Sequence, residues 1–271
     1  MPDTHNSLKK RWQILTEQPA RFVCAPFDLA RYLLTGALSC HHHHVLLACM
    51  PKSGSTFLSS ILGNLPGFHS ASLTPGFGRR EQELDPLLMI FNHRTNYVAQ
   101  QHVRYSATTE IWRQHFGLKP IVLVRNLFDV IPSIRDHFRR EDMVAPMGYA
   151  TQAMCEWEDA KLDAFIVTML IPWYFNFYCS WLDCENKLIV RYEDINADPI
   201  PVVEQIASYC GLSFSREAIE CASNKAQNSA TRKNQAVIGR GQSLNAELKD
   251  RIYEMAAFYP GVDFAPIGII R

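Results

Sequence analysis

Residues 45–56, VLLACMPKSGST, constrain the fold more than any other stretch of this chain. Residues 45–49 form an apolar run, which is typical of a strand buried on both faces of a parallel sheet. A loop of small and hydroxyl-bearing residues follows, and apolar residues then recur at helical spacing (Phe57, Leu58, Ile61 and Leu62). Gly54 lets the backbone approach a ligand closely, so N–H groups of the loop and of the helix start can point at one anion. The stretch therefore predicts a strand–loop–helix unit that binds phosphate or sulfate.

The loop PKSGST differs from the loop that holds magnesium-bound nucleoside triphosphates. That loop has the pattern GxxxxGK[ST], in which lysine directly follows the second glycine. Here Lys52 precedes Gly54, and no second glycine stands before it at the required spacing. Lys52 supplies a mobile positive charge, while Ser55 and Thr56 supply hydroxyl donors. We therefore expect an anion other than a magnesium triphosphate.

A second anion-binding position follows the apolar run 121–124, which predicts another strand. Arg125 stands at the carboxyl end of that strand, the edge where open parallel sheets bind ligands. Ser133 falls in the first turns of a helix expected over residues 129–138, and Asp129 is expected to cap this helix. A guanidinium and a hydroxyl placed in this way can bind one phosphate group together.

Strands and helices alternate along the rest of the chain. A third strand is expected over residues 187–190, followed by a helix that Asp198 caps. Gly117 and Pro120 are expected to end the helix before the second strand, and the last helix is expected over residues 245–258. This alternation predicts an α/β fold of three layers, in which helices flank a central parallel sheet.

One domain is expected over residues 1–271, with residues 1–40 as an N-terminal extension outside the motifs. Residues 224–243 are polar and contain glycine, which predicts a mobile loop over the ligand. Residues 164–182 carry no charge and are about long enough to span a bilayer. Pro172 and several aromatic residues favour instead a kinked helix buried in the core.

The composition excludes several classes of protein. The formal net charge of zero argues against general nucleic-acid binding, which needs a basic excess. The eight cysteines include no CxxC pattern, so we expect reduced thiols and, without an export signal or transmembrane segment, a cytoplasmic protein. The apolar stretch 22–38 leaves peripheral membrane contact open. The run from His41 to His44 is interpreted as a solvated loop and not as a metal site, because neighbouring histidines on a strand point to opposite faces.

Together, PKSGST and the pair Arg125 and Ser133 resemble the motifs of sulfotransferases that use 3'-phosphoadenosine-5'-phosphosulfate (PAPS). The resemblance implies that Arg125 and Ser133 bind the 3'-phosphate. It implies that Tyr192 contacts the adenine, as does Phe57, at a position where the family usually has tryptophan. It also implies that the loop binds the 5'-phosphosulfate through Pro51, Lys52, Ser53, Gly54, Ser55 and Thr56.

The same resemblance implies a basic, glycine-containing segment near the C-terminus that closes over the 3'-phosphate. Two stretches fit this description: Arg232 with the lysine after it, and the sequence Gly239, Arg240, Gly241. The second is similar to the form found in bacterial relatives. Arg240 is therefore favoured, with Arg232 as the alternative.

The family often places a catalytic histidine on the strand between the two motifs, and His102 lies at the matching position. Gln100 stands where the family has a lysine. A hydrogen-bonded structural histidine is the other interpretation of His102. The alternative base is a carboxylate, Glu83 or Glu81, because some carbohydrate sulfotransferases use glutamate.

The sequence thus predicts transfer of a sulfuryl group from PAPS to a hydroxyl, with an amine as the second choice. The acceptor would be a small molecule, a saccharide or a lipid-linked compound. His102 would accept its proton while Lys52 stabilises the leaving phosphate in an in-line displacement. No metal is expected, because PAPS itself carries the activated group. A kinase of P-loop type and a non-catalytic nucleotide-binding relative are the alternatives.

Overall fold

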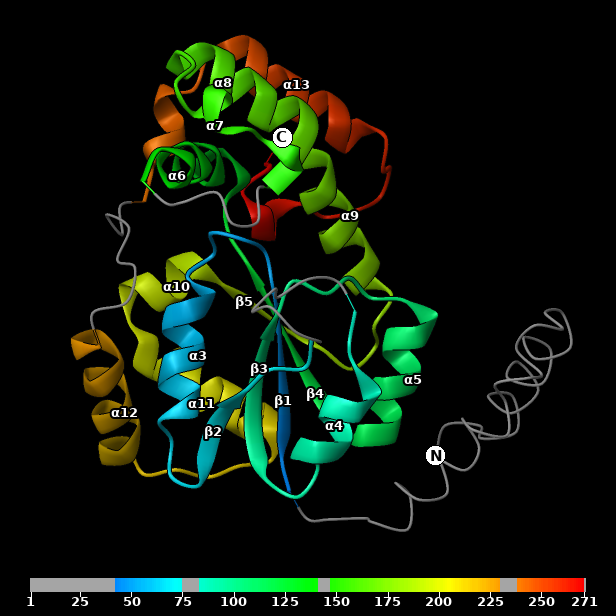
Figure 1. Cartoon of the computed structure of the whole chain (residues 1–271), viewed down its shortest axis with the longest axis vertical. Coiled ribbons are helices and arrows are strands. Elements are labelled where there is room, and N and C mark those ends of the chain that lie inside the picture. Colours follow the sequence, from blue (N-terminus) through cyan, green and yellow to red (C-terminus); the bar gives the residue numbers. More distant parts are fainter. Residues whose placement is uncertain (1–41, 75–82, 141–146, 230–237, 271) are drawn as a thin grey trace, which may run out of the picture. The chain divides into compact units, whose positions relative to one another are not determined.

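The computed structural model describes residues 42–74, 83–140, 147–229 and 238–270 (Figure 1). The chain divides into two compact units, Met1–His41 and His42–Arg271, and every described residue lies in the second. The expectations for the first 40 residues, including peripheral membrane contact, fall outside the described residues and stay predictions.

The centre of the described unit is a five-stranded sheet in the order β2-β3-β1-β4-β5. Every neighbouring pair is parallel, which confirms the predicted sheet. The parallel arrangement brings the carboxyl ends of all strands to one edge. The strands are β1 (His44–Cys49), β2 (Phe68–Ala71), β3 (Asn96–Gln101), β4 (Leu118–Val124) and β5 (Leu188–Arg191).

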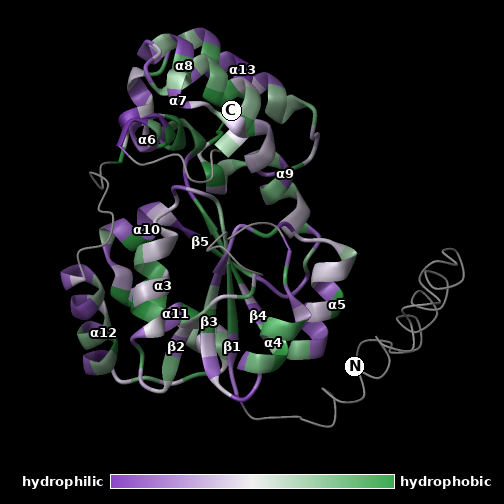
Figure 2. Ribbon diagram, in the orientation of Figure 1, coloured by the Kyte–Doolittle hydropathy of each residue, from purple (hydrophilic) through white to green (hydrophobic). Residues whose placement is uncertain are grey.

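Both faces of the sheet are covered, so its strands carry apolar side chains at successive positions. On β1, Val45, Leu47 and Cys49 join one core cluster, while Leu46 and Ala48 join the other. The first cluster includes residues of four helices: α3 (Ser55–Gly63), α10 (Tyr192–Ala197), α11 (Pro199–Cys210) and α12 (Arg216–Asn228). In the hydropathy view of Figure 2, most of β1 is green. The predicted three-layer α/β fold is confirmed.

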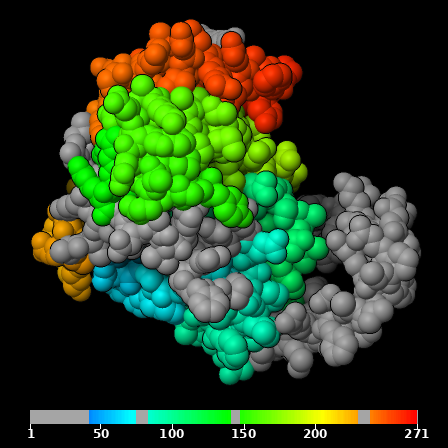
Figure 3. Space-filling view, turned by 45° about the horizontal axis from the view of Figure 1, so that its top comes forward, coloured from blue at the N-terminus to red at the C-terminus, as the bar shows by residue number. Residues whose placement is uncertain are grey.

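The second core cluster contains most of the remaining helices, several of which lie beyond the carboxyl edge of the sheet (Figure 1). In the space-filling view, green residues from the middle of the chain lie below the orange and red C-terminal residues (Figure 3). The helices are α4 (Pro86–Asn92), α5 (Ala107–Phe116), α6 (Leu127–Arg140), α7 (Gln152–Cys155), α8 (Asp159–Phe165), α9 (Ile171–Leu182) and α13 (Ala246–Ala257), while α10 (Tyr192–Ala197) follows β5 directly.

The helical stretch Asp159–Leu182 is the one described segment long and apolar enough to cross a membrane, and 56% of its most apolar window is buried within the protein. Its middle, Ile166–Leu170, is a π-helical turn, and Pro172 stands at the start of α9. Phe175, Tyr178 and other side chains of α9 belong to the core. The predicted buried helix is confirmed, and the irregular turn precedes the proline.

Local signals place several helix ends as expected. Gly117, with φ of 63°, ends α5, and the Asp198 carboxylate accepts from Ile200 N at the start of α11. The expectation that Pro120 precedes the strand is wrong, because Pro120 lies inside β4. Pairing of β4 with β5 begins only at Ile121, so Pro120 stands where β4 has a single neighbour. A missing N–H is tolerated at such a position.

His44 is not part of a solvated loop, which corrects the interpretation of that end of the histidine run. It is the first residue of β1 and is 2% exposed. Its Nδ1 lies 2.7 Å from the Phe116 carbonyl and its Nε2 lies 3.0 Å from the His93 carbonyl. Burial lowers the pKa of His44 below its usual value. His41 lies outside the described residues.

Candidate active site

The loop between β1 and α3 is held in place from two sides. Ser53 donates from Oγ to the Met50 carbonyl at 2.6 Å, and the buried Tyr174 hydroxyl of α9 donates to the Pro51 carbonyl at 3.1 Å. Lys52 and Gly54 both have positive φ, 63° and 77°. This left-handed backbone is unfavourable for lysine, so the surrounding contacts must stabilise it.

Gly54 and Tyr192 are in close contact. A Cβ added at Gly54 would lie 2.6 Å from Cδ2 of Tyr192, so no side chain fits there without moving the ring. Tyr192 opens α10 directly after β5. The tyrosine that the sequence assigns to the adenine therefore lies against the anion loop itself.

Arg125 joins the two predicted anion sites. Its Nη1 donates to the Lys52 carbonyl at 2.8 Å, and its guanidinium lies 4.2 Å from the centroid of the Tyr192 ring. The residue is 5% exposed, and burial lowers its pKa. Its Nε is buried and has no hydrogen-bond partner among the described residues. Guanidinium groups are almost never buried without an anion, so this one is suited to bind a ligand anion.

The carboxylates near Arg125 are occupied by backbone donors. Glu193 accepts from Asn126 N at 2.9 Å, and Asp129 accepts from Gly239 N at 2.8 Å and from Gly241 N at 2.7 Å. Both raise the pKa of Arg125 through electrostatic attraction. They therefore favour the charged guanidinium, while Asp129 with both oxygens and Glu193 with Oε1 accept from backbone N–H groups.

The expectation that Asp129 caps α6 is wrong. Asn126 instead accepts from Phe128 N at 2.9 Å at the start of this helix. Asp129 is 2% exposed, and its contacts are with residues more than a hundred positions later in the chain. The carboxylate thus fixes the C-terminal segment against the start of α6.

The segment Gly239 to Gly241 is folded onto α6, which partly corrects the expected loop over residues 224–243. Residues up to Asn228 belong to α12, and Arg240–Ser243 forms a 3-10 helix. A Cβ at Gly241 would lie 2.4 Å from the Phe128 carbonyl carbon, so only glycine fits there. Residues 230–237, including Arg232, lie outside the described residues.

Arg240 is brought to the helix that carries Ser133. Its Nη1 pairs with Asp136 Oδ2 at 2.7 Å, with both side chains mostly buried. The positive charge of Arg240 lowers the pKa of Arg125, so the two cations act on each other electrostatically. Ser133 is 1% exposed in the second turn of α6. The structure therefore brings Arg240 to α6, the helix that follows Arg125 and carries Ser133.

His102 directly follows β3, and its ring is oriented by the neighbouring strand. Its Nδ1 lies 2.8 Å from the Cys49 carbonyl oxygen, with Cys49 Sγ 3.4 Å away. A carbonyl oxygen only accepts, so Nδ1 carries the proton and Nε2 carries the lone pair of the neutral ring. This tautomer suits a general base that acts through Nε2.

Gln100 contacts the anion loop, which the sequence did not predict. Its Nε2 donates to Ser55 Oγ at 2.7 Å in a buried setting. Because the Ser55 oxygen accepts this bond, its own proton points elsewhere and is available to a ligand. Phe57 is half-buried and packs on the core face that carries α3.

Glu83, the alternative base, lines a cavity of about 570 Å³ that also includes Arg104 and Tyr105. These two residues come directly after Val103, so the cavity begins two positions beyond His102. Glu81 lies outside the described residues.

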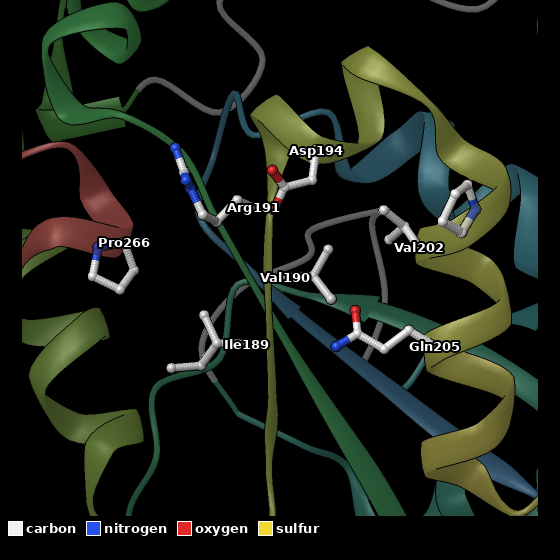
Figure 4. Close-up of a pocket in the computed structure, with 8 residues that line it drawn as sticks. Ile189, Val190, Arg191, Asp194, Val202, Gln205 and Pro266 are labelled. Atoms are coloured by element: carbon white, nitrogen blue, oxygen red, sulfur yellow. The ribbon is translucent and has the colours of Figure 1, made fainter.

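A second cavity, of about 430 Å³, lies along the outer edge of β5 (Figure 4). Arg191, Asp194 and Gln205 line it, together with apolar residues. None of the predicted site residues lines this cavity.

In the part of the chain that the structure describes, no group of three or more histidine, cysteine, aspartate or glutamate residues is placed to hold a metal ion. The six cysteines of that part are free thiols.

Residues 42–253 match the family model of the sulfotransferase domain. This chain belongs to the sulfotransferase domain family. The matched range includes both predicted anion-binding segments, His102 and the segment around Arg240.

Relatives of this sulfotransferase domain include the flavonol 3-sulfotransferase of Flaveria bidentis, which is 25% identical over 203 residues. That match covers 68% of this chain and 62% of the relative, so the chain spans less than two thirds of the relative's length. Among solved structures, mouse sulfotransferase SULT7A1 complexed with PAP is similar with a TM-score of 0.60 and 15% identity, over 80% of this chain and 83% of that one. At this identity the structural likeness concerns the fold.

Proposed function

We propose that this chain binds PAPS and transfers its sulfuryl group to an acceptor hydroxyl, or secondarily to an amine. The observation that carries the proposal is the buried Arg125, which touches the Lys52 carbonyl and the Tyr192 ring and keeps a buried Nε without a protein partner in the described residues. One ligand with anionic groups at two ends and an aromatic ring between them fits such a site. Adenosine 3',5'-bisphosphate (PAP), the product of PAPS, has this chemistry.

The 5'-phosphosulfate would lie on the loop, which presents its N–H groups, Lys52 and the Ser55 and Thr56 hydroxyls. The 3'-phosphate would lie between Arg125 and Ser133, with Arg240 closing over it. Tyr192 and Phe57 would contact the adenine. The contact of Tyr192 with Gly54 and the electrostatic coupling of Arg240 to Arg125 support these assignments.

In the reaction, the acceptor oxygen attacks sulfur while the bond from sulfur to the 5'-phosphate oxygen breaks. PAP leaves with the electron pair, and Lys52 with the loop N–H groups stabilises the charge that develops on it. His102 Nε2 takes the acceptor proton, since its Nδ1 is committed to the Cys49 carbonyl. Glu83 is the alternative base, and a cytoplasmic location stays a prediction.

The test is nucleotide binding followed by transfer. Calorimetry or a thermal shift with PAP is expected to show binding that Arg125→Ala weakens, while ATP with magnesium is expected to bind poorly. Labelled PAPS with a panel of saccharides, phenols, lipids and amines would then show label transfer. Preferential binding of ATP with magnesium would contradict the proposal and favour a kinase.

A further inference from the structure

The cavity of about 570 Å³ is lined by the segment that begins two residues after His102, the proposed base. One wall is the segment after His102, including Arg104 and Tyr105, and the opposite wall is the end of α9. Tyr105 N donates to Ser180 Oγ at 3.1 Å, and Trp181 Nε1 donates to the Val103 carbonyl at 2.9 Å. These bonds fix the two walls to each other, so the cavity is preformed.

The lining of this cavity is polar in a way that suits a polyhydroxylated ligand. Among the described residues that line it, Leu84 is the one aliphatic side chain. The others bring carboxylates, a guanidinium, an amide, hydroxyls and two aromatic rings, through Glu83, Arg104, Tyr105, Trp112, Asn176 and Asp183 among them. Carboxylates and amides bind hydroxyl groups, and aromatic faces pack on the apolar C–H groups of a sugar ring. A flat phenol or steroid would instead need an apolar slot.

The charges of the lining point to the type of sugar. Glu83 and Asp183 are acidic, while Arg104 is basic. The acidic excess disfavours sugars that already carry carboxylate or sulfate groups and favours neutral or amino sugars.

Asp183 has a position that helix stability does not explain. It is the C-cap of α9 and is exposed. A carboxylate at this end of a helix is unfavourable, because the helix dipole is negative there. A ligand contact would account for an acidic side chain at this place.

We infer that this cavity binds the acceptor and that the acceptor is a neutral or amino sugar; the assignment as an acceptor site rests on the proposed sulfuryl transfer. The binding of a sugar to this cavity does not depend on the proposed sulfuryl transfer, because it can be measured without nucleotide.

The experiment is saturation-transfer NMR on the full chain, with and without PAP, using methyl glucoside, glucosamine, glucuronate and 2-naphthol as probes. Binding of the first two, with glucuronate and 2-naphthol weaker, is expected. Asp183→Asn and Asn176→Leu are expected to weaken sugar binding by about tenfold or more, whereas Glu185→Gln, an exposed control just beyond α9, leaves it unchanged.

Two results would overturn the sugar site: tighter binding of 2-naphthol than of either sugar, or sugar affinities that neither cavity variant changes. The PAP affinity of the same samples is read separately. Failure to bind PAP would contradict the proposed function, while sugar binding without nucleotide would still support the cavity assignment.

Discussion

The guanidinium of Arg125 donates to the backbone carbonyl of Lys52 over a distance of 2.8 Å, which links two segments 73 residues apart. The contact joins the carboxyl ends of β4 and β1, neighbours in the sheet. Both predicted anion sites therefore lie at neighbouring strand ends and touch each other, as the proposed binding of one ligand requires.

Arg125→Ala is expected to weaken PAP binding by about 10- to 100-fold, because hydrogen bonds to a charged group contribute about 1.5–3 kcal/mol. Arg125→Lys should recover only part of this affinity, since lysine lacks the planar group that stacks on Tyr192. Calorimetric titration with PAP measures both. Arg251→Ala, at an exposed arginine of α13, is the control and should bind like wild type.

Gly54→Ala is expected to lower both stability and PAP affinity. Alanine at a φ of 77° costs about 1–2 kcal/mol, and its Cβ would also displace the Tyr192 ring. Gly117→Ala is a matched control, because Gly117 has a φ of 63° with open space around it. Urea unfolding and PAP titration should show the strain in both variants and the loss of affinity in Gly54→Ala only. Equal PAP affinities of Gly54→Ala and Gly117→Ala would contradict a role of the contact between Gly54 and Tyr192 in PAP binding.

Asp129→Asn is expected to release the segment that carries Arg240. One carboxylate accepts from two backbone N–H groups, and an amide offers a single acceptor oxygen. A loss of about 1–3 kcal/mol in the free energy of unfolding and weaker PAP binding should follow. Asp250→Asn, on the exposed side of α13, is the comparison. If Asp129→Asn binds PAP with wild-type affinity, the segment that carries Arg240 does not contribute to nucleotide binding, and this prediction is wrong.

His102→Ala is expected to lower kcat for sulfuryl transfer by about 10²–10⁴-fold while PAP affinity stays within twofold of wild type. A base acts on the acceptor proton and not on the nucleotide, which is the reason for the split. Glu83→Gln is the parallel variant. If it lowers kcat more than His102→Ala does, the carboxylate is the base.

His44 should make stability depend on pH. Its pKa is lowered in the folded protein, so the unfolded chain binds a proton first as the pH falls below about 6.5. The free energy of unfolding is therefore expected to be fully retained well above that pH and to decrease as the pH falls through it. Urea unfolding at several pH values measures it, with His44→Gln expected to flatten the slope and His69→Gln, at an exposed position, as the control. If the pH dependence of the free energy of unfolding is unchanged in His44→Gln, His44 is not the source of that dependence.

Local signals in the sequence predicted the elements that carry the site. The apolar run of β1, the cap at Asp198 and the last helix, α13, were each predicted from residues close together in the chain. Strand β2 was missed, because it has four residues, two of them exposed, and no apolar run. Strand β3 was expected only through the family resemblance around His102, since its sequence NYVAQQ has no apolar run either. Caps and periodicity report on neighbours only.

Contacts between distant segments account for what the sequence could not predict. The bonds from Asp129 to Gly239 and Gly241 and the bond from Gln100 to Ser55 form only once the chain has folded. The identity of each residue is compatible with a simpler role, such as a cap for Asp129. The roles of these residues could be assigned only once the order of the strands in the sheet was known.

The long apolar helix Asp159–Leu182 is also part of the support of the anion loop, through the bond from Tyr174 to the Pro51 carbonyl. Trp181 of the same helix holds the segment that follows His102. Insertion of this helix into a bilayer would break both contacts and pull two supports away from the reaction centre. A lipid-embedded form and a catalytically competent form of the chain would therefore exclude each other.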